Sequence, residues 1–142
     1  MRKKVMAAVL TAAMVASVSA MPQMVAAADD EFKIGLITDV GGVNDGSFNQ
    51  SAWEGLEKAG EELGVEVNYL ESATDADYQP NMETFVDEDY DLIISVGYML
   101  ADATREAAEA NPDTKFAIID DSSIDLPNVT SLMFKAEQAS YL

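Results

Sequence analysis

Residues 33–50, KIGLITDVGGVNDGSFNQ, constrain the fold of this chain more than any other stretch. They begin with a short apolar run at residues 34–37, which is typical of a buried strand. A glycine-rich segment follows at residues 41–46, and Ser47 then opens a pattern of helical period. A strand, a tight loop and a helix in this order predict an open α/β sheet. In such sheets small ligands bind at the carboxyl ends of the strands.

The glycine-rich segment has the outline of a phosphate-binding loop, a glycine, four residues and a second glycine. Ser47 stands where the lysine of such a loop is expected, and the spacing does not match G-x-G-x-x-G either. Asp39 and Asp45 would also repel a polyanion from the helix N-terminus. Carboxylates at this place favour a neutral or cationic ligand that is rich in N–H or O–H donors.

Phe48 stands in the first turn of the predicted helix, beside this loop. One interpretation is that its ring stacks on a planar ligand while Asp39 and Asp45 accept hydrogen bonds from it. The other interpretation is structural, with both aspartates capping the turn and Phe48 belonging to the core. The residues alone leave both interpretations open.

The run GLITDVGGVNDGSFNQ, residues 35–50, resembles the opening of the basic membrane protein family. These are substrate-binding proteins of ABC importers, related to purine nucleoside receptors. They are similar to type I periplasmic binding proteins, with two α/β lobes around a cleft, and are usually more than twice this length. The chain ends at Tyr141 and Leu142 inside what reads as a starting helix, so we expect a truncated first lobe. The similarity covers everything after about residue 32 and continues at residues 92–98, 116–120, 127–129 and 134–135.

The helix after the glycine loop is predicted from a stripe of apolar residues and from its ends. Ser47 and Gln50 form an S-x-x-Q capping box, and Gly64 suits the position after the last turn. Trp53 lies in this helix and is interpreted as a packing residue. The stripe consists of Phe48, Ala52, Leu56, Ala59 and Leu63.

The rest of the chain alternates strand and helix patterns. Strands separated by helices predict right-handed crossovers and a parallel sheet flanked by helices, which agrees with the first lobe that the resemblance implies. Further helices are predicted at residues 77–86 and about 100–110. Further strands are predicted at residues 65–70, 92–96, 116–119 and 129–134.

The candidate ligand-binding residues follow these strands, because the carboxyl ends of parallel strands lie at one edge of the sheet. The resemblance implies that Asp39 and Phe48 bind a base and that Asp120 binds ribose-type hydroxyls. Phe134 is expected at the same edge, and Asp121, Ser122 and Asp125 are interpreted as solvated loop residues. The further candidates for ligand contact are Asn44, Asn49, Gly97 and Tyr98.

Composition excludes several classes of function. With 8 basic and 26 acidic residues, the net charge of −18 argues against nucleic acid or an anionic membrane as a partner of this surface. Cysteine and histidine are absent, which excludes disulfides, thiol catalysis and a Ser-His-Asp mechanism, and makes zinc an unsuitable metal. We therefore predict no catalytic residues, no metal site and no cofactor.

The first 28 residues are predicted to be a signal peptide. A basic start at residues 2–4 precedes an apolar run of 14 residues at positions 5–18, which is short for a membrane span. Small-residue cleavage patterns end at Ala20 and at Ala28, and cleavage after Ala28 is preferred because the polar pair Asp29-Asp30 follows. Residues 29–142 then form the truncated N-terminal lobe. Many members of the family are lipoproteins, but this chain has no lipobox cysteine, so the resemblance implies only a location outside the cytoplasmic membrane.

The function that the resemblance implies is the extracytoplasmic solute-binding component of an ABC importer. Its ligand would be a small molecule, with a purine nucleoside preferred, and its partner an ABC permease; we expect a monomer. Two alternatives stay open, a secreted α/β hydrolase-like enzyme and an acidic-pocket signalling domain. The latter would bind magnesium through Asp120 and Asp121.

Overall fold

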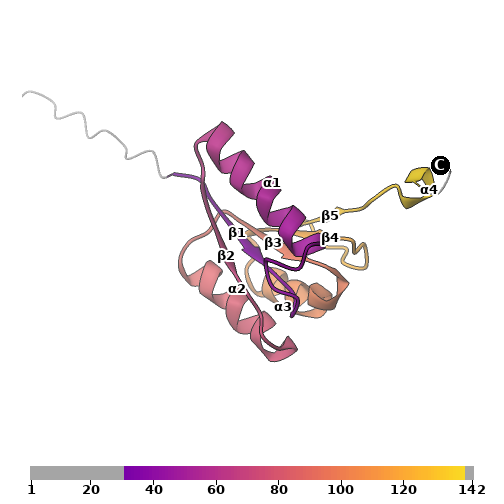
Figure 1. Cartoon of the computed structure of the whole chain (residues 1–142). Helices are drawn as coiled ribbons and strands as arrows, with labels where there is room; N and C mark the ends of the chain where they lie inside the picture. Colours follow the sequence, from indigo (N-terminus) through magenta and orange to yellow (C-terminus); the bar gives the residue numbers. More distant parts are fainter. Residues whose placement is uncertain (1–30, 140–142) are drawn as a thin grey trace, which may run out of the picture.

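The computed structural model describes residues 31–139 as one parallel sheet between helices (Figure 1). Its strand order is β2-β1-β3-β4-β5, and every neighbouring pair of strands is parallel. The strands are β1 Lys33–Ile37, β2 Glu66–Leu70, β3 Leu92–Val96, β4 Lys115–Ile119 and β5 Val129–Leu132. The predicted fold class, a parallel α/β sheet flanked by helices, is confirmed.

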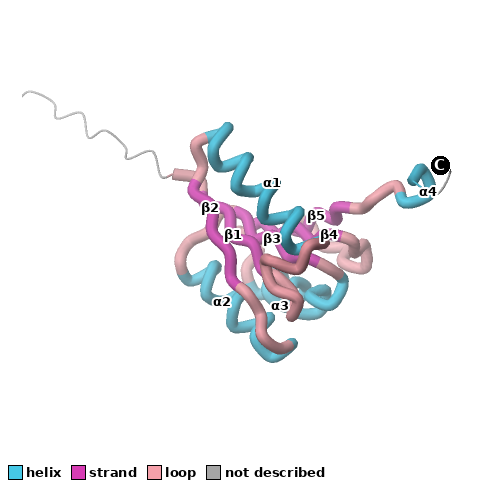
Figure 2. The backbone as a smooth tube through the Cα atoms, in the orientation of Figure 1, coloured by secondary structure: helices cyan, strands magenta, loops and turns pink. Residues whose placement is uncertain are grey.

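The helices form two unequal layers. Helix α1, Phe48–Leu63, covers one face of the sheet alone, whereas α2, Tyr78–Asp87, and α3, Ala101–Ala110, cover the other (Figures 1 and 2). Single turns of 3₁₀-helix lead into α2 and α3, at Asp75–Asp77 and Tyr98–Leu100. The last helix, α4 at Ala136–Ala139, follows β5 and stands away from the sheet (Figure 1).

The core has one part on each face of the sheet. Under α2 and α3 the buried side chains include Phe85, Met82 and Phe116, which are at most 1 % exposed. Under α1 the buried cluster is smaller, and the half-buried Trp53 completes it by packing on Tyr69, with ring centroids 4.7 Å apart. This contact confirms the packing role predicted for Trp53.

Gly35 in β1 sets how closely α2 approaches the sheet. A Cβ atom at this position would lie 2.6 Å from the ring of Phe85, a separation that carbon atoms do not tolerate. Glycine is therefore required here by close packing and not by backbone conformation. The ring of Phe85, which fills the space above Gly35, is 1 % exposed.

The apolar stripe predicted for α1 is only partly buried. Leu56, in its middle, is 6 % exposed, but Leu63 is 72 % exposed and Phe48 is 47 % exposed. The physical reason is length, because a helix of 16 residues spans about 24 Å whereas strands of 5 residues span about 17 Å. Both ends of α1 therefore project beyond the sheet. Gly64 ends the helix as predicted, with φ of 68°.

Strand β5 is shorter than predicted. Its last pair joins Leu132 to Ile119, the final residue of β4, so Met133 and Phe134 find no partner strand and leave the sheet. The other predicted strands and helices agree with the structure to within about two residues. Among residues 31–139 no helix is long and apolar enough to cross a membrane. The predicted signal peptide lies outside the described residues.

Candidate ligand-binding site

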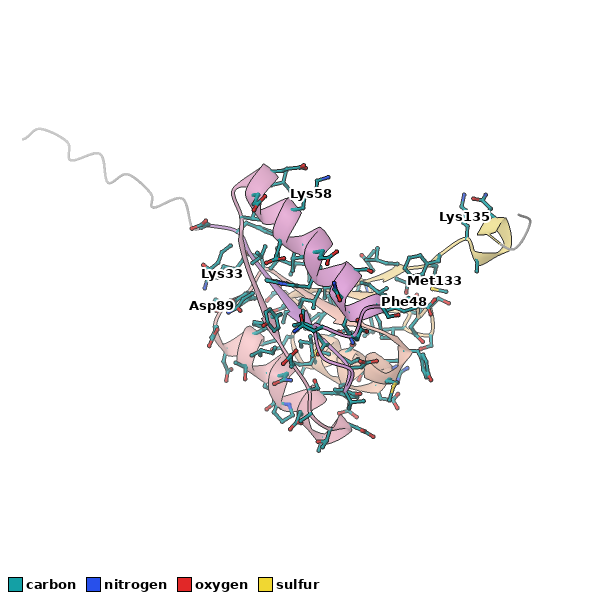
Figure 3. The ribbon with its side chains drawn as sticks, in the orientation of Figure 1. Lys33, Phe48, Lys58, Asp89, Met133 and Lys135 are labelled. Carbon is teal, nitrogen blue, oxygen red and sulfur yellow. The ribbon has the colours of Figure 1, made fainter. Side chains whose placement is uncertain are left out.

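The residues that follow the strands lie at one edge of the sheet, as predicted. The backbone pairing continues up to this edge, since Gly97 N–H donates to the carbonyl of Ile119 at 3.1 Å and Asp120 N–H to that of Leu132 at 2.9 Å. In Figure 3, Phe48 at the start of α1 lies near Met133, far from Lys33 and Asp89 at the opposite edge. The name "ligand edge" is used below for residues 38–48, 71–72, 97–99, 120–123 and 132–134.

Asp39, directly after β1, is half-buried and tied to its own loop. Its Oδ1 accepts hydrogen bonds from Gly41 N–H at 2.8 Å and from the Asn49 side-chain amide at 2.7 Å. Its Oδ2 faces the turn after β3, where a Cβ atom on Gly97 would lie 4.0 Å away. The carboxylate therefore has one oxygen held by the loop and one beside a bare glycine.

Asp45 caps α1, and the predicted capping box is wrong. Ser47 occupies the N-cap position but its side chain makes no capping hydrogen bond. Instead, Oδ1 of Asp45 accepts N–H groups of Ser47 at 2.8 Å and Gln50 at 3.1 Å, and Oδ2 accepts that of Asn49 at 3.2 Å. The Gln50 side chain turns back to the N–H of Gly46, at 3.1 Å. An aspartate two residues before the N-cap residue reaches three donors and displaces the serine hydroxyl from its usual role.

The capping contacts lower the pKa of Asp45. Desolvation acts to raise this pKa, and the backbone N–H groups of Gln50, Ser47 and Asn49 outweigh it, because hydrogen bonds to a carboxylate favour its charged form. Asp45 is therefore ionised at neutral pH and structurally occupied. For Asp45 the structure therefore agrees with the structural interpretation, in which this aspartate caps the turn.

Glu71, directly after β2, was not predicted as part of this region. Its Oε1 accepts Val43 N–H at 2.7 Å and would lie 2.9 Å from a Cβ atom on Gly42. The Val43 side chain is 5 % exposed, so the middle of the β1–α1 loop is anchored to the loop after β2. The rule that strand ends share one edge, applied to β2 as well, would have singled out Glu71.

Phe48 is not a core residue, so the second interpretation fails for this ring. It is 47 % exposed and meets Phe134 edge to face, with ring centroids 5.6 Å apart and planes at 77°. The two rings lie at a groove of about 430 Å³. Phe134 was predicted to lie at this edge but was not predicted to bind the ligand. The rest of the groove is lined by Ser47, Ser51, Ala52 and Ile119.

Asp120 and Asp121, after β4, are arranged differently from each other. Asp120 is exposed, has φ of 63° and makes no side-chain hydrogen bond to the described residues. Oδ1 of Asp121 accepts the N–H and the hydroxyl of Ser123, at 2.8 and 2.7 Å. Within residues 31–139 no three Asp, Glu, His or Cys side chains are grouped to hold a metal ion. The magnesium-binding alternative thus gains no support from the described part of the chain.

The further candidates divide by exposure. Asn44 is exposed, Tyr98 is 68 % exposed, and Gly97 adopts φ of 94°, which only glycine takes readily. Asn49, by contrast, is 1 % exposed and lies beneath the loop. Three of these candidates therefore lie at the surface of the ligand edge, whereas Asn49 does not.

Tyr78, at the start of α2, is a buried polar residue near this edge. Burial raises the pKa of its hydroxyl, and the nearby carboxylates of Asp39 and Asp75 add to the effect. Its oxygen makes no hydrogen bond of good geometry to the described residues, and a weaker backbone contact at Val40 offsets only part of the rise in pKa. The phenol is therefore neutral at physiological pH and adds no charge beside Asp39.

Comparison with known proteins decides the family. A family model described as ABC transporter substrate-binding protein PnrA-like matches residues 32–142. The chain belongs to this family. A CD4+ T-cell-stimulating antigen of Listeria monocytogenes is 49 % identical over 117 residues, covering 79 % of this chain and 33 % of the relative. The ABC transporter nucleoside-binding protein BmpA of Lactococcus lactis is 40 % identical over 116 residues, with the same coverage.

The likeness extends to solved structures. A solute-binding protein of an ABC transporter system from Aeropyrum pernix K1 has a TM-score of 0.67 and 32 % sequence identity, over 73 % of this chain and 29 % of that one. The chain spans about a third of the length of the curated relatives that it matches. The described residues thus correspond to the first lobe of a type I periplasmic-binding-protein-like fold, which confirms the resemblance seen in the sequence.

Proposed function

We propose that this chain is the N-terminal lobe of an extracytoplasmic solute-binding protein that captures a purine nucleoside for an ABC permease. The observation that carries the proposal is the half-exposed ring of Phe48 at the same sheet edge as the fixed carboxylate of Asp39. A planar base with N–H groups suits an aromatic face combined with a charged acceptor. The printed name of the Lactococcus relative, a nucleoside-binding protein, supports the same ligand class.

The mechanism is capture without chemistry. The base stacks on Phe48, Asp39 accepts an N–H of the base, and Asp120 accepts ribose hydroxyls at the end of β4. Asn44, Gly97 and Tyr98 line the same edge. A second lobe then closes over the ligand, the hinge movement usual for binding proteins of this kind. The family is one of substrate-binding proteins. We expect the full-length protein to act as a monomer and to have no enzymatic activity.

The decisive test is the affinity of Phe48→Ala and Asp39→Ala variants of a full-length protein that carries this lobe. Titration calorimetry with adenosine, guanosine and inosine should show a loss of about 1–3 kcal/mol for the stacking ring and about 1.5–3 kcal/mol for the carboxylate. Phe32→Ala is the matched control, because Phe32 is also 47 % exposed but precedes β1 at the opposite edge.

Thermal melts of the same variants separate binding from folding. Since Phe48 is half-exposed and its ring contacts Phe134 edge to face, its replacement should lower the melting temperature only modestly. Equal affinities of the Phe48→Ala and Phe32→Ala proteins would remove the stacking role. A melting temperature that falls sharply for Phe48→Ala, with affinity kept by the folded fraction, would do the same.

The lobe alone should bind weakly, because it supplies one wall of a two-walled cleft. Losing the contacts of the other wall shifts a micromolar site toward the millimolar range, from about −8 to about −4 kcal/mol. Nuclear magnetic resonance titration of residues 29–142 with inosine measures this affinity. Submicromolar binding by this chain would contradict the two-lobed mechanism.

The same proposal makes residues 1–28 a signal peptide and residues 29–142 the exported lobe. Expression in an export-competent host should yield a chain that begins at Asp29, and cleavage after Ala20 is the alternative. Mass spectrometry of the secreted product distinguishes these ends. A membrane-bound product with Met1 intact would make the segment an anchor.

A further inference from the structure

The two oxygens of the Asp39 carboxylate have different surroundings. Oδ1 accepts two hydrogen bonds, from the backbone of Gly41 and from the amide of Asn49. Oδ2 has no hydrogen-bond partner among the described residues and faces Gly97, whose missing side chain leaves space beside it. A carboxylate held through one oxygen in this way offers the other oxygen in a single direction.

Asn49 is the side chain that enforces this asymmetry. It comes from the first turn of α1, is 1 % exposed, and donates from Nδ2 to Oδ1 of Asp39 at 2.7 Å. The orientation of its amide follows from chemistry, because an ionised carboxylate only accepts hydrogen bonds. The backbone N–H of the same residue is held by Asp45, so its position depends on the cap of the helix. The Oδ1 atom of Asn49 is buried without a hydrogen-bond partner among the described residues, and a side chain that is 1 % exposed presents little surface to a ligand.

Gly41 provides a second, independent sign that this hydrogen bond is built into the loop. A Cβ atom at Gly41 would lie 3.0 Å from Oδ1 of Asp39 and 3.2 Å from Nδ2 of Asn49. Even a methyl group would therefore press on both partners of the bond. The φ of Gly41 lies outside the left-handed region, so the backbone alone does not demand glycine here.

We propose that Asn49 is a positioning residue for ligand binding. It fixes Asp39 through Oδ1, so that Oδ2 alone is presented to one N–H or O–H donor of the ligand. The same helical turn carries Phe48, so a single element sets both the ring and, through Asn49, the carboxylate. This inference rests on the proposed function for its ligand, and it gives Asn49 a positioning role in place of the ligand contact predicted from the sequence.

The first experiment needs no ligand and tests this chain directly. Side-chain couplings measured by nuclear magnetic resonance report the χ1 rotamers of Asp39 in the wild type and in Asn49→Ala, Asn49→Asp and Gly41→Ala. We expect one rotamer in the wild type and averaged rotamers in all three variants, since each breaks the bond by a different route. Asn49→Asp is measured at a pH where both carboxyl groups are ionised, because a proton shared by the pair would restore a hydrogen bond. Asn49→Asp keeps the volume of the buried side chain. If the other two variants do not fold, the rotamers of Asp39 can still be measured in this one.

Two controls match these variants. Gly55→Ala adds a methyl group to α1 where no atom lies within 4 Å, and Gln50→Ala removes two side-chain hydrogen bonds, to Gly46 and Glu54, without touching Asp39. Both should retain the single rotamer. A rotamer of Asp39 that stays unchanged in Asn49→Ala and Gly41→Ala would overturn the positioning role.

The second experiment is a double-mutant cycle on inosine binding by the full-length protein. Asn49→Ala should weaken binding about tenfold when Asp39 is present, the size expected for losing one charge-assisted hydrogen bond. It should change the affinity less than about twofold in an Asp39→Ala background, because the two residues act as one unit. Equal losses in both backgrounds would mean a merely structural role. A wild type that binds no nucleoside would refute the proposed ligand, while the rotamer test would still decide the positioning.

Discussion

The loop after β1 and the loop after β4 meet at the same sheet edge but are held very differently. Backbone N–H groups of the first loop donate to Asp39 and Asp45 within it and to Glu71, which follows β2. Residues 41–50 are therefore held at several points. In the second, Asp121 bonds only to Ser123 two residues on, and Asp120 makes no side-chain hydrogen bond to the described residues. Asp120 also holds φ of 63°, a conformation that costs an ordinary residue free energy.

Under the proposed function, the contrast indicates two ways of preparing a binding edge. The β1–α1 loop is ordered before any ligand arrives, which reduces the entropy lost on binding. Asp120 instead sits in a strained backbone with its carboxylate in solvent. Strain of this kind persists where the surrounding structure enforces it and is concentrated at functional sites. The three predictions below test whether rigidity and strain are divided in this way.

The largest effect is expected for Gly42→Ala in the first loop. A left-handed conformation costs an L-residue about 1–2 kcal/mol, and here the new methyl group would also meet Glu71 at 2.9 Å. Displacing Glu71 leaves the N–H of Val43 without its acceptor, which adds about 1–3 kcal/mol. Urea denaturation measures the lost free energy of unfolding.

Gly46→Ala is its control, because Gly46 has φ of 67° but no atom within 4 Å of the added methyl group. It should lose only the backbone part, about 1–2 kcal/mol. Equal losses for the two variants would show that the bond between Glu71 and Val43 does not hold the loop.

A smaller effect is expected for Asp45→Asn. Weakening an N-terminal cap costs about 1 kcal/mol, and the exposure of Asp45 to solvent reduces the electrostatic share. Because the folded state lowers the pKa of Asp45, its stabilisation is present above the unfolded value of 3.8 and is lost as the pH falls through the folded value. The gap between wild type and variant should therefore be full at pH 7 and close below about pH 4.

Thermal melts from pH 7 to pH 2 test this dependence. Asp125→Asn, in the second loop, is the control, since Asp125 is exposed and makes no side-chain hydrogen bond to the described residues. A gap for Asp45→Asn that stays constant with pH would show that the carboxylate charge is not what caps the helix.

The smallest effect, and one of opposite sign, is expected for Asp120→Gly. Relief of the left-handed strain outweighs the extra entropy of glycine in the unfolded chain, so stability should be unchanged or rise by less than about 1 kcal/mol. Nucleoside affinity of the full-length protein should fall. Asp89→Gly removes the same strain, at φ of 57°, on the opposite edge of the sheet and should leave affinity unchanged. Equal affinities of both variants would remove the role of Asp120.

Periodicity was enough to predict most of the fold. Residues 92–96 form the predicted strand β3 without any shift, and Gly64 ends α1 as expected, because both depend on neighbours along the chain. The end of β5 could not be predicted in this way, since it depends on where β4 stops. The end of β5 is therefore set by a strand that is distant in the sequence, and the local pattern of residues does not show where that end lies.

The candidate site was predicted in position but not in detail. Asp39, Gly97 and Asp120 follow the strands as the strand-end rule predicts, and Phe48 begins α1 beside the loop. The capping box failed because Asp45 and Ser47 compete for the same N–H groups, and sequence spacing does not show which side chain reaches them. Asn49 was predicted as a candidate for ligand contact, but it is 1 % exposed. The sequence does not show which polar residues of a helical turn face inward.

The close packing of Gly35 on Phe85 has a mechanical consequence for the ligand edge. Helix α2 carries both Phe85 and Asn81, and the Asn81 amide donates to the carbonyl of Glu71 at 3.2 Å. Glu71 in turn holds Val43 in the middle of the β1–α1 loop. Through these contacts, a displacement of α2 in the interior of the protein is passed on to the loop at the ligand edge. A side chain added at Gly35 would press on Phe85 of α2 and so shift the β1–α1 loop without touching any of the candidate ligand-binding residues.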